Sequence, residues 1–576
     1  MGTICAERKG GSTYYVYRES FREKIDPASE GKAKGSGRSR VRTRAIYLGT
    51  AEKILKSIEE AREPQRVLTR GFGLVAAAYQ TAVQIGLQEI LTKHIPGHRA
   101  GVERWIYFFV SIINRLDSAT SKETMGKWLH KTVLPELLGV DPRRMTGQMF
   151  WYAADDMLSE KGLKEHRKRQ SNADDLLGGL GEDLFTGIEM DLFTRVDQLM
   201  GLSPGAVCYD TTNFYTYIEE PKRSELANTC HSKDSKHHLR HVGLLMAVEK
   251  SHGVPLLSQV YRANRHDSKI FSQILADLVV ALKRLCGSES DLVVVLDKGN
   301  NSPENFAHMS GVISWVGALV PSHHPDLIDI DLSDYHGYWK ELQYYRCRKT
   351  VMDIECTLVM IFNAATKRKQ EHSLKRGIEK LKTAIREKWA AYKTRPHTVP
   401  QGISTIRQQS PYEKCLDVSV INGELHIEEN SVEIEARKKR FGKNLIFSNL
   451  LEAETGYLIE TYNHKQIIED DFHLLKDPAM IRFRPIRHWT DTKIRAYAFC
   501  CIVAMTLMRV MQWKAAKAGY KMTPNVLKEE LSDVREAVMV YSRKDARRKI
   551  TERSAVQEKL WKIFNLQEIE QMVLIH

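Results

Sequence analysis

Three carboxylates stand where they could act together on phosphate esters. Asp210 follows an apolar run that begins at Ala206, Asp297 follows another that begins at Asp291, and Glu469 lies in a helical stretch. Cutting or joining a phosphodiester requires an in-line nucleophile and neutralised charge on the entering and leaving oxygens. Two metal ions about 3.5–4 Å apart supply both. Mg²⁺ prefers carboxylate oxygens. The three acids therefore predict a two-metal site for phosphoryl transfer, in which each is a metal ligand and a catalytic residue.

Each aspartate alone also has a structural interpretation. An acid directly after a strand often caps the next element. Asp210 is followed by Thr-Thr-Asn-Phe, and Asp297 by Lys298 and Gly-Asn-Asn-Ser. In both places a turn is expected at the rim of a sheet, and Asn301 and Ser302 could orient the second loop. Either acid alone favours the capping role, whereas the pair favours function.

The surroundings of Glu469 carry more information. A single helix is predicted from Tyr457 to Lys476, and four of its residues fall on one stripe because their offsets are three, four and seven. The carboxylate suits a metal ion, and the ammonium groups suit phosphates. The alternative is a solvated charged face. Asp470 and Asp471 project elsewhere and are weaker candidates. The stripe consists of Tyr462, Lys465, Glu469 and Lys476.

This stripe resembles the Y-(2)-R-(3)-E-(6)-K signature of the IS-four-type DDE transposases of bacterial insertion sequences, and it matches the spacing at all four positions. Lys465 stands where the signature has Arg, which keeps the charge but loses the bidentate fork. Other stretches resemble the same family, and together they cover most of the chain from Tyr209 to Leu507. They are Tyr209 to Tyr215, His231 to Val248, Leu296 to Asn305 and Arg484 to Leu507.

The resemblance implies an RNase H-like core interrupted by a β-strand domain. It also implies Mg²⁺-dependent DNA transposition, with Mn²⁺ as a substitute, by a cut-and-paste route that uses a DNA hairpin in several members. The partners would be double-stranded DNA, namely terminal inverted repeats and target DNA, and a second copy in a synaptic homodimer. The expected location is the cytoplasm, at a bacterial nucleoid. Tyr462, Lys465, Lys476 and Lys298 would contact DNA.

Composition agrees with an intracellular DNA-binding protein. The 576 residues predict several domains, and 86 Lys and Arg against 72 Asp and Glu give a net charge of +14. Charge alone equally allows a soluble protein that is merely basic. Nine scattered cysteines without a CxxC pair argue against a disulfide scaffold. Met1 to Gly10 lacks the apolar region of a signal peptide, and Ala496 to Met511 is expected to be a core helix, so no membrane is expected.

The order of predicted elements indicates an α/β fold with an RNase H-like core. Strands are predicted at Ala206 to Tyr209, Gly243 to Val248, Pro255 to Val260, Asp291 to Leu296 and Val316 to Val320, with a helix at Lys269 to Leu285. Before them, Trp105 to Leu116 and Met145 to Leu158 have helical periodicity. Strand composition appears at Thr13 to Tyr17 and Ala45 to Leu48, on either side of the basic loop Gly31 to Arg44.

These elements suggest six segments, which follow in chain order. They are an N-terminal β-hairpin with a basic loop (1–50), a mainly helical DNA-binding region and linker (51–200), the first part of the core (201–324), a β-rich insertion that also holds a charged helix near Thr366 to Lys393 (325–443), the second part of the core (444–512), and a C-terminal region for protein contacts or support of the core (513–576).

A cluster of histidines and basic residues precedes the second predicted strand. Zinc could use the histidines, but the interleaved Lys and Arg favour a segment that faces DNA. Lys233 and Arg240 are the expected phosphate contacts. Trp315 and Trp339 could stack on an extruded base, although core packing is the simpler role for both. The potential zinc ligands are Cys230, His231, His237, His238 and His241.

Two other functions remain open. One is a catalytically silent, DNA-binding relic of a transposase, and the other is an RNase H-like nuclease that acts on RNA–DNA hybrids. The sequence has no GxSxG elbow, which argues against serine hydrolase chemistry. It also has no GxxxxGK[ST] loop, which argues against ATP hydrolysis.

Overall fold

The computed structural model describes residues 2–24, 39–60, 63–157, 184–202, 205–218, 224–230, 235–264, 279, 292–392, 398–542 and 545–575. The chain divides into two compact units. The smaller unit joins Met1–Arg70 with Arg535–Thr551, and the larger unit joins Gly71–Val534 with Glu552–His576.

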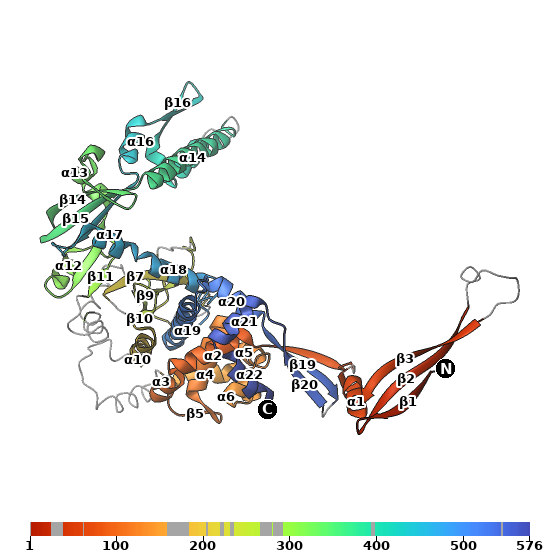
Figure 1. Cartoon of the computed structure of the whole chain (residues 1–576). Helices are drawn as coiled ribbons and strands as arrows, with labels where there is room; N and C mark the ends of the chain where they lie inside the picture. Colours follow the sequence, from red (N-terminus) through yellow and green to blue (C-terminus); the bar gives the residue numbers. More distant parts are fainter. Residues whose placement is uncertain are drawn as a thin grey trace, which may run out of the picture. The chain divides into compact units, whose positions relative to one another are not determined.

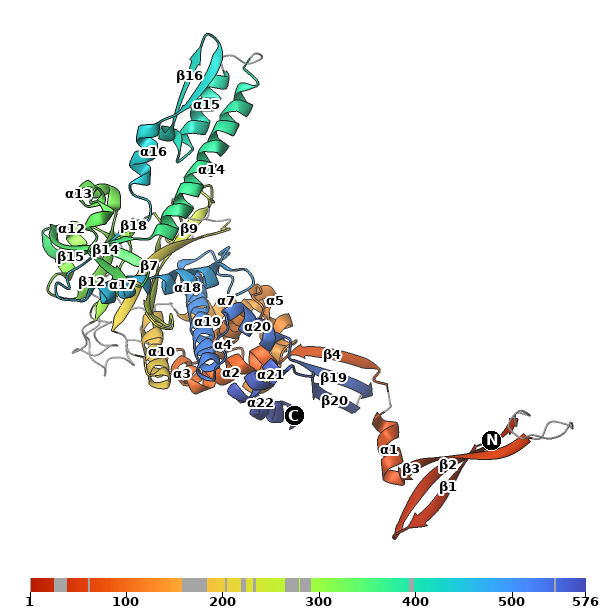
Figure 2. The ribbon, with the colours of Figure 1, turned by 45° about the horizontal axis from the view of Figure 1, so that its top comes forward.

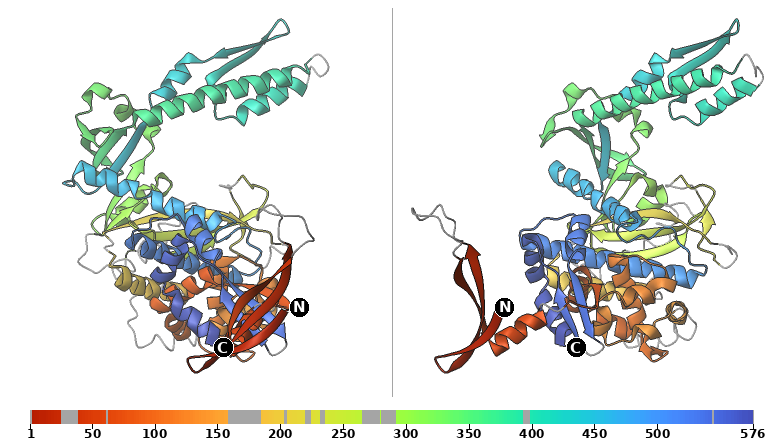
Figure 3. Two further views of the ribbon diagram at one scale, coloured as in Figure 1. Left: turned by 45° about the vertical axis from the view of Figure 1, so that its right-hand side comes forward. Right: turned by 90° about the vertical axis from the view of Figure 1, so that its right-hand side faces the viewer.

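The smaller unit contains two three-stranded sheets. In the first, β1 (Gly2–Lys9), β2 (Ser12–Lys24) and β3 (Ser39–Thr50) pair antiparallel in that order and form a long ribbon, followed by helix α1 (Ala51–Glu60) (Figure 3). The predicted strands at Thr13 and Ala45 are confirmed. The predicted loop is shorter than expected, because residues 39–44 belong to β3; residues 31–38 lie outside the described part.

The second sheet joins distant parts of the sequence. Its order is β20-β19-β4, with β4 at Arg66–Gly71, β19 at Arg535–Ser542 and β20 at Asp545–Ile550. The carboxylate of Glu536 is fully buried and lies 3.3 Å from Arg70 and 3.7 Å from Arg548. The sequence segment 513–576 thus contributes strands to a sheet with the N-terminal region.

The larger unit begins with helices. Helix α4 is rich in apolar residues and is buried except at its ends, and the side chain of Ser121 caps α5. The helices predicted at Trp105 and Met145 are confirmed as α4 and α7. The set comprises α2 (Gly73–Gln84), α3 (Leu87–His94), α4 (Arg104–Asp117), α5 (Lys122–Leu129), α6 (Leu134–Leu138), α7 (Gly147–Met157) and α10 (Leu184–Met200).

The long helix α19 (Asp491–Lys517) joins these helices to the rest of the unit. It packs against α2, α4, α7 and α10 and against strand β10 (Pro255–Arg262) (Figure 1). By length and composition it could cross a membrane, but 89% of its most apolar window is buried inside the protein. The prediction of a core helix at Ala496 to Met511 is therefore confirmed.

A mixed sheet of ten strands forms the centre of the larger unit. Its order is β10-β9-β7-β11-β12-β18-β15-β14-β13, with β8 paired to β9. β7, β11 and β12 are parallel, whereas β9, β10 and β18 run antiparallel to their neighbours. The bounds are β7 (Ala206–Tyr215), β8 (Asn228–Thr229), β9 (Arg240–Glu249), β11 (Val293–Val295), β12 (Ser314–Leu319), β13 (Gly337–Trp339), β14 (Leu342–Val351), β15 (Ile354–Phe362) and β18 (Lys443–Ser448).

All five predicted strands of the core are present, as β7, β9, β10, β11 and β12. One boundary is wrong. The strand of Asp210 does not end there but runs five residues further to Tyr215, because Thr211, Thr212 and Phe214 are β-branched or aromatic and are buried. The helix predicted at Lys269 to Leu285 lies outside the described residues except for Val279.

The segment predicted as a β-rich insertion is divided. Its strands β13, β14 and β15 extend the central sheet through β18. The remainder is mostly helical, with α14 (Ala364–Trp389), α15 (Thr398–Gln408) and α16 (Ser431–Lys438) beside the hairpin β16 (Leu416–Ile421) and β17 (Glu424–Glu429) (Figure 2). An apolar stripe through charged α14 anchors a separate small core, which includes Leu374, Ile378, Leu381 and Ile385.

A tight turn joins the two strands of the hairpin in this segment. Asn422 and Gly423 both have positive φ, at 51° and 80°, as the tight turn between β16 and β17 requires. At the C-terminus, α20 (Pro524–Ser532), α21 (Ala555–Ile563) and α22 (Leu566–Ile575) complete the larger unit, where Trp561 stacks on Phe72 at 5.4 Å between ring centroids.

Candidate active site

Strand register brings two of the predicted acids together. The parallel pairing of β7 with β11 matches Cys208 with Val295. β11 ends at Val295; if this register continued two residues beyond it, Asp210 would lie opposite Asp297 on a neighbouring chain segment, and paired strands lie about 4.8 Å apart. The backbone N–H of Thr211 donates to the Asp210 carboxylate at 2.7 Å. Asp297 lies two residues beyond the end of β11, which is shorter than the predicted strand, and directly precedes a short turn at Lys298–Asn300.

The predicted helix that carries the third acid, Glu469, is divided into two helices. α17 (Thr455–Asn463) and α18 (Gln466–Lys476) are separated by His464 and Lys465. The backbone there stays right-handed but switches to three-residue hydrogen bonds, from Lys465 N–H to Tyr462 O and from Ile467 N–H to His464 O. The prediction of one continuous helix is therefore wrong, although Lys465 and Glu469 still lie on the same face.

Lys465 connects this face to the sheet. Its ammonium Nζ lies 3.0 Å from Asp297 Oδ1 and 3.0 Å from Glu469 Oε1. The lysine side chain is only 13% exposed, whereas the two carboxylates are 35% and 42% exposed. Burial by itself disfavours the charged ammonium, but the two carboxylates outweigh burial and hold the pKa of Lys465 above its ordinary value. Lys465 therefore forms a cationic bridge between Asp297 and Glu469.

Tyr462 and Lys298 belong to the same neighbourhood. Burial, and after it the charges of Asp297 and Glu469, raises the pKa of Tyr462 to about 12, so its phenol is a neutral hydrogen-bonding group. Burial lowers the pKa of Lys298 although Asp297 opposes that shift. Asn444 was not among the predicted site residues, but its side chain hydrogen-bonds Tyr462. Asn444 lies in β18, whereas Tyr462 lies in α17.

The carboxylates of Asp297 and Glu469 are suited to a divalent cation, although in the structure the ammonium of Lys465 lies between them. Asp297 and Glu469 point oxygens at one position, and Lys465 Nζ takes that position. Within the described ranges, no group of three or more His, Cys, Asp or Glu side chains lies close enough together to hold a metal ion. Hard carboxylate oxygens that converge on one cation are nonetheless the ligand type that Mg²⁺ takes.

The other predicted DNA contacts are more dispersed. Lys476, at the end of α18, holds its ammonium 5.7 Å from the centre of the Phe214 ring on β7. Arg240 begins β9 and donates to the carbonyl of Ala227 at 3.0 Å. Lys233 and His231 lie outside the described residues. Of the remaining histidines in that cluster, His241 is fully buried, whereas His237 and His238 are exposed.

Several secondary candidates have structural roles. Trp315 is fully buried and packs against Phe306, so it is a core residue. Trp339 lies against α17, where an added Cβ at Gly456 would come within 2.8 Å of its ring. The amide of Asn301 donates to the carbonyl of Ala318 on β12 at 2.9 Å, which ties down the loop after Asp297.

The two acids beside Glu469 do project elsewhere. Asp470 is exposed, whereas Asp471 is fully buried and pairs with Arg509 of α19 at 2.6 Å. Burial raises the pKa of Asp471 to about 7, against the opposing effect of Arg509. This pair fastens α18 to the core helix and thereby fixes the orientation of the helix that carries Glu469.

Comparison with known proteins gives structural likenesses only. No protein-family model and no curated protein matches the sequence. The structure is similar to the piggyBac transposase in a synaptic complex with hairpin DNA, at 10% sequence identity and a TM-score of 0.39, over 80% of this chain and 76% of that one. It is also similar to the Mos1 transposase in a paired-end complex with the left transposon end, at 12% identity and a TM-score of 0.15, over 42% of this chain and 65% of that one.

Proposed function

We propose that the protein is a DDE-type DNA transposase with an RNase H-like core, which cuts and joins phosphodiesters at element ends. The observation that carries this proposal is the convergence of Asp297 and Glu469 on one cation, beside the position that strand register gives to Asp210. The strand order β10-β9-β7-β11-β12, with three antiparallel strands followed by parallel ones, supports the core assignment.

In this proposal Asp210, Asp297 and Glu469 would hold Mg²⁺ or Mn²⁺. When bound, such ions neutralise charge on the oxygens of the scissile phosphate and activate the attacking hydroxyl. The chain's own groups would do the rest. Lys476, beside Phe214 on the same strand as Asp210, offers a cation to the DNA backbone. Tyr462 offers a neutral hydroxyl, and Lys465 can turn from the carboxylates to a phosphate oxygen.

The substrate is proposed to be double-stranded DNA that carries terminal inverted repeats, together with target DNA, bound by two copies of the chain. A hairpin intermediate and a location at the bacterial nucleoid belong to the same proposal. They rest on the resemblance of the sequence blocks that carry Asp210, Asp297 and Glu469.

The decisive experiment removes one carboxylate charge. Glu469→Gln keeps the size of the side chain but loses its charge, so metal-dependent cleavage of inverted-repeat DNA should be abolished while DNA binding in a mobility-shift assay is retained. The exposed neighbour Asp470→Asn is the matched control and should cleave at the wild-type rate. Wild-type cleavage by Glu469→Gln would refute the assignment.

A catalytically silent, DNA-binding relative is the second candidate. The observation that favours it is Lys465, which takes the place of a cation between two of the three acids. A nicking assay with supercoiled plasmid and Mn²⁺ separates the two functions, since the relic would bind DNA without any metal-dependent nicking.

A further inference from the structure

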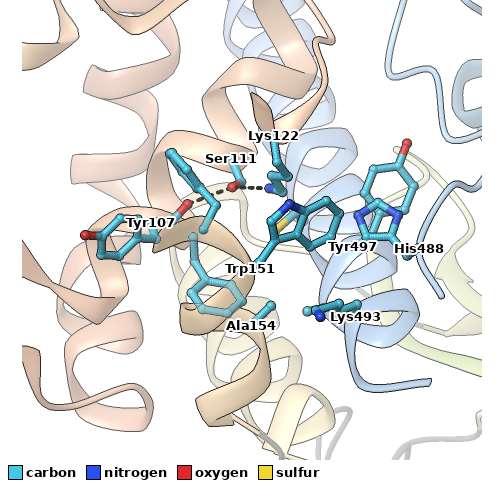
Figure 4. A pocket seen from close by; sticks show the side chains of 12 residues that line it. Tyr107, Ser111, Lys122, Trp151, Ala154, His488, Lys493 and Tyr497 are labelled. Carbon is cyan, nitrogen blue, oxygen red and sulfur yellow. Dashed lines mark hydrogen bonds between the residues drawn. The ribbon is translucent and has the colours of Figure 1, made fainter. Parts of the chain in front are cut away.

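A cavity remote from the carboxylates lies where the N-terminal helices meet α19. It is partly open to solvent, so its empty volume of about 310 Å³ includes solvent space outside the enclosed part. Figure 4 shows side chains from α4, α5, α7 and α19 around it, together with His488, which lies just before α19. The polar groups that face it are Ser111, Lys122, His488 and Lys493.

The charged groups of this cavity are cationic. Lys122 Nζ donates to Ser111 Oγ at 2.6 Å and lies 5.3 Å from the Phe150 ring centre, and no carboxylate of the described residues pairs with it. Arg115 lies behind it, almost fully buried, and donates to the carbonyl of Thr120. Lys493 pairs with one acid, Asp155, at 3.1 Å. Lys122 and Lys493 are half-buried, and among the described residues only Lys493 has a carboxylate partner, so the cavity carries an excess of positive charge.

His488 faces the same space. It is 8% exposed, and neither ring nitrogen has a hydrogen-bond partner among the residues that the structure describes. Its ring stacks on Tyr497 at 4.3 Å between centroids and meets Trp151 edge-on at 5.0 Å. Burial, and after it the charges of Lys122, Arg115 and Lys493, lowers the pKa of His488, so the imidazole is neutral and offers one N–H donor.

We propose that this cavity binds a phosphate group, held by Lys122, Lys493 and His488. Each group supplies donors, no carboxylate of the described residues pairs with Lys122, and a half-buried ammonium without such a partner is stabilised when an anion joins it. A phosphate oxygen accepts strong, charge-assisted hydrogen bonds from such donors. Free phosphate and a phosphate carried on a nucleic-acid end share this chemistry. The site is separate from the carboxylates and does not depend on the proposed function.

The first test is phosphate binding by the full chain, measured by calorimetry and by thermal shift at constant ionic strength with chloride as the reference. Lys122→Met should weaken phosphate binding roughly tenfold to a hundredfold, because one hydrogen bond to a charged group is lost. Lys127→Met is the matched control, since this exposed lysine lies on the same helix α5 and should leave binding unchanged.

The behaviour without phosphate distinguishes a binding residue from a purely structural one. Removing a half-buried charge that has no carboxylate partner among the described residues should keep or raise the melting temperature of unliganded Lys122→Met. A structural role through Ser111 predicts the reverse, with a lower melting temperature and an unchanged phosphate affinity, and that result would overturn the proposal. Lys493→Met provides a second variant and should also weaken phosphate binding.

A second comparison identifies the source of the phosphate. A short DNA duplex with 5′-phosphates is compared with the same duplex bearing 5′-hydroxyls, in the wild-type protein and in Lys122→Met. A preference for the phosphorylated ends that Lys122→Met removes indicates a nucleic-acid end, and a response to inorganic phosphate alone indicates the free ion. If neither probe binds more weakly to Lys122→Met than to the wild-type protein, the proposal is wrong.

Discussion

Replacing Lys465 by methionine should tighten the binding of a divalent cation in the absence of DNA. In the structure the ammonium of Lys465 lies 3.0 Å from an oxygen of both Asp297 and Glu469. A metal ion shared by these two carboxylates must therefore displace the ammonium. Methionine fills a similar volume without charge, so both carboxylates become available.

The size of the effect follows from the two ion pairs that the metal has to break. Lys465 is 13% exposed but its partners are 35% and 42% exposed, so water screens both contacts. Each pair then contributes about 1 kcal/mol, the upper end for exposed pairs. Together they amount to about 2 kcal/mol, which corresponds to a roughly thirtyfold change in affinity because a tenfold change is about 1.4 kcal/mol.

The assay is titration of the full chain with Mn²⁺, in which the free ion is followed by electron paramagnetic resonance. Lys465→Arg keeps the positive charge and should bind Mn²⁺ as weakly as the wild-type protein. Lys438→Met, which breaks an unrelated ion pair with Glu435 on α16, should also leave the affinity unchanged. An affinity of Lys465→Met equal to or weaker than that of the wild-type protein would refute the displacement of Lys465 by the metal.

Two further predictions concern stability. Asp471→Ala leaves Arg509 buried without its partner and should lower the free energy of unfolding by about 3–5 kcal/mol in urea denaturation; Asp470→Ala, at an exposed position, should change it by less than about 0.5 kcal/mol, and equal effects of the two variants would contradict the buried pair. Burial lowers the pKa of Lys122 to about 8, below its value in the unfolded chain. The unfolded chain therefore binds more protons between pH 8 and about 10.5. In phosphate-free buffer the wild-type protein should gain stability over Lys122→Met as pH rises through that window, and a constant difference would contradict the shift.

Sequence patterns predicted the parts of the site that depend on local spacing. Lys465 and Glu469 are four residues apart, and their side chains meet as helical periodicity requires. The strands of Asp210 and Asp297 were also recognisable from their apolar runs. That the two acids lie opposite each other follows from register, which the spacing along the chain does not encode.

Other features depended on contacts between distant segments. The stretch from Tyr457 to Lys476 contains neither Pro nor Gly, and Gly456 precedes it. The sequence therefore does not mark the break at Lys465. Lys465 was assigned to phosphates from its position on the stripe, whereas the structure shows it against Asp297, a residue on another element. The cationic cavity likewise combines α4, α5, α7 and α19, whose polar residues are unremarkable when each helix is considered alone.

The pairing of β4 with β19 sets the order in which the molecule can be built. Residues 66–71 and 535–542 are separated by most of the chain, so this sheet cannot close until a ribosome has released nearly the whole polypeptide. The ribbon of β1, β2 and β3 needs only the first fifty residues and can form at once. The cost of closing so long a loop grows only slowly with its length, but contacts so far apart in sequence form slowly. The ribbon can therefore form before residues 535–542 have been synthesised, whereas the sheet of β4 and β19 cannot.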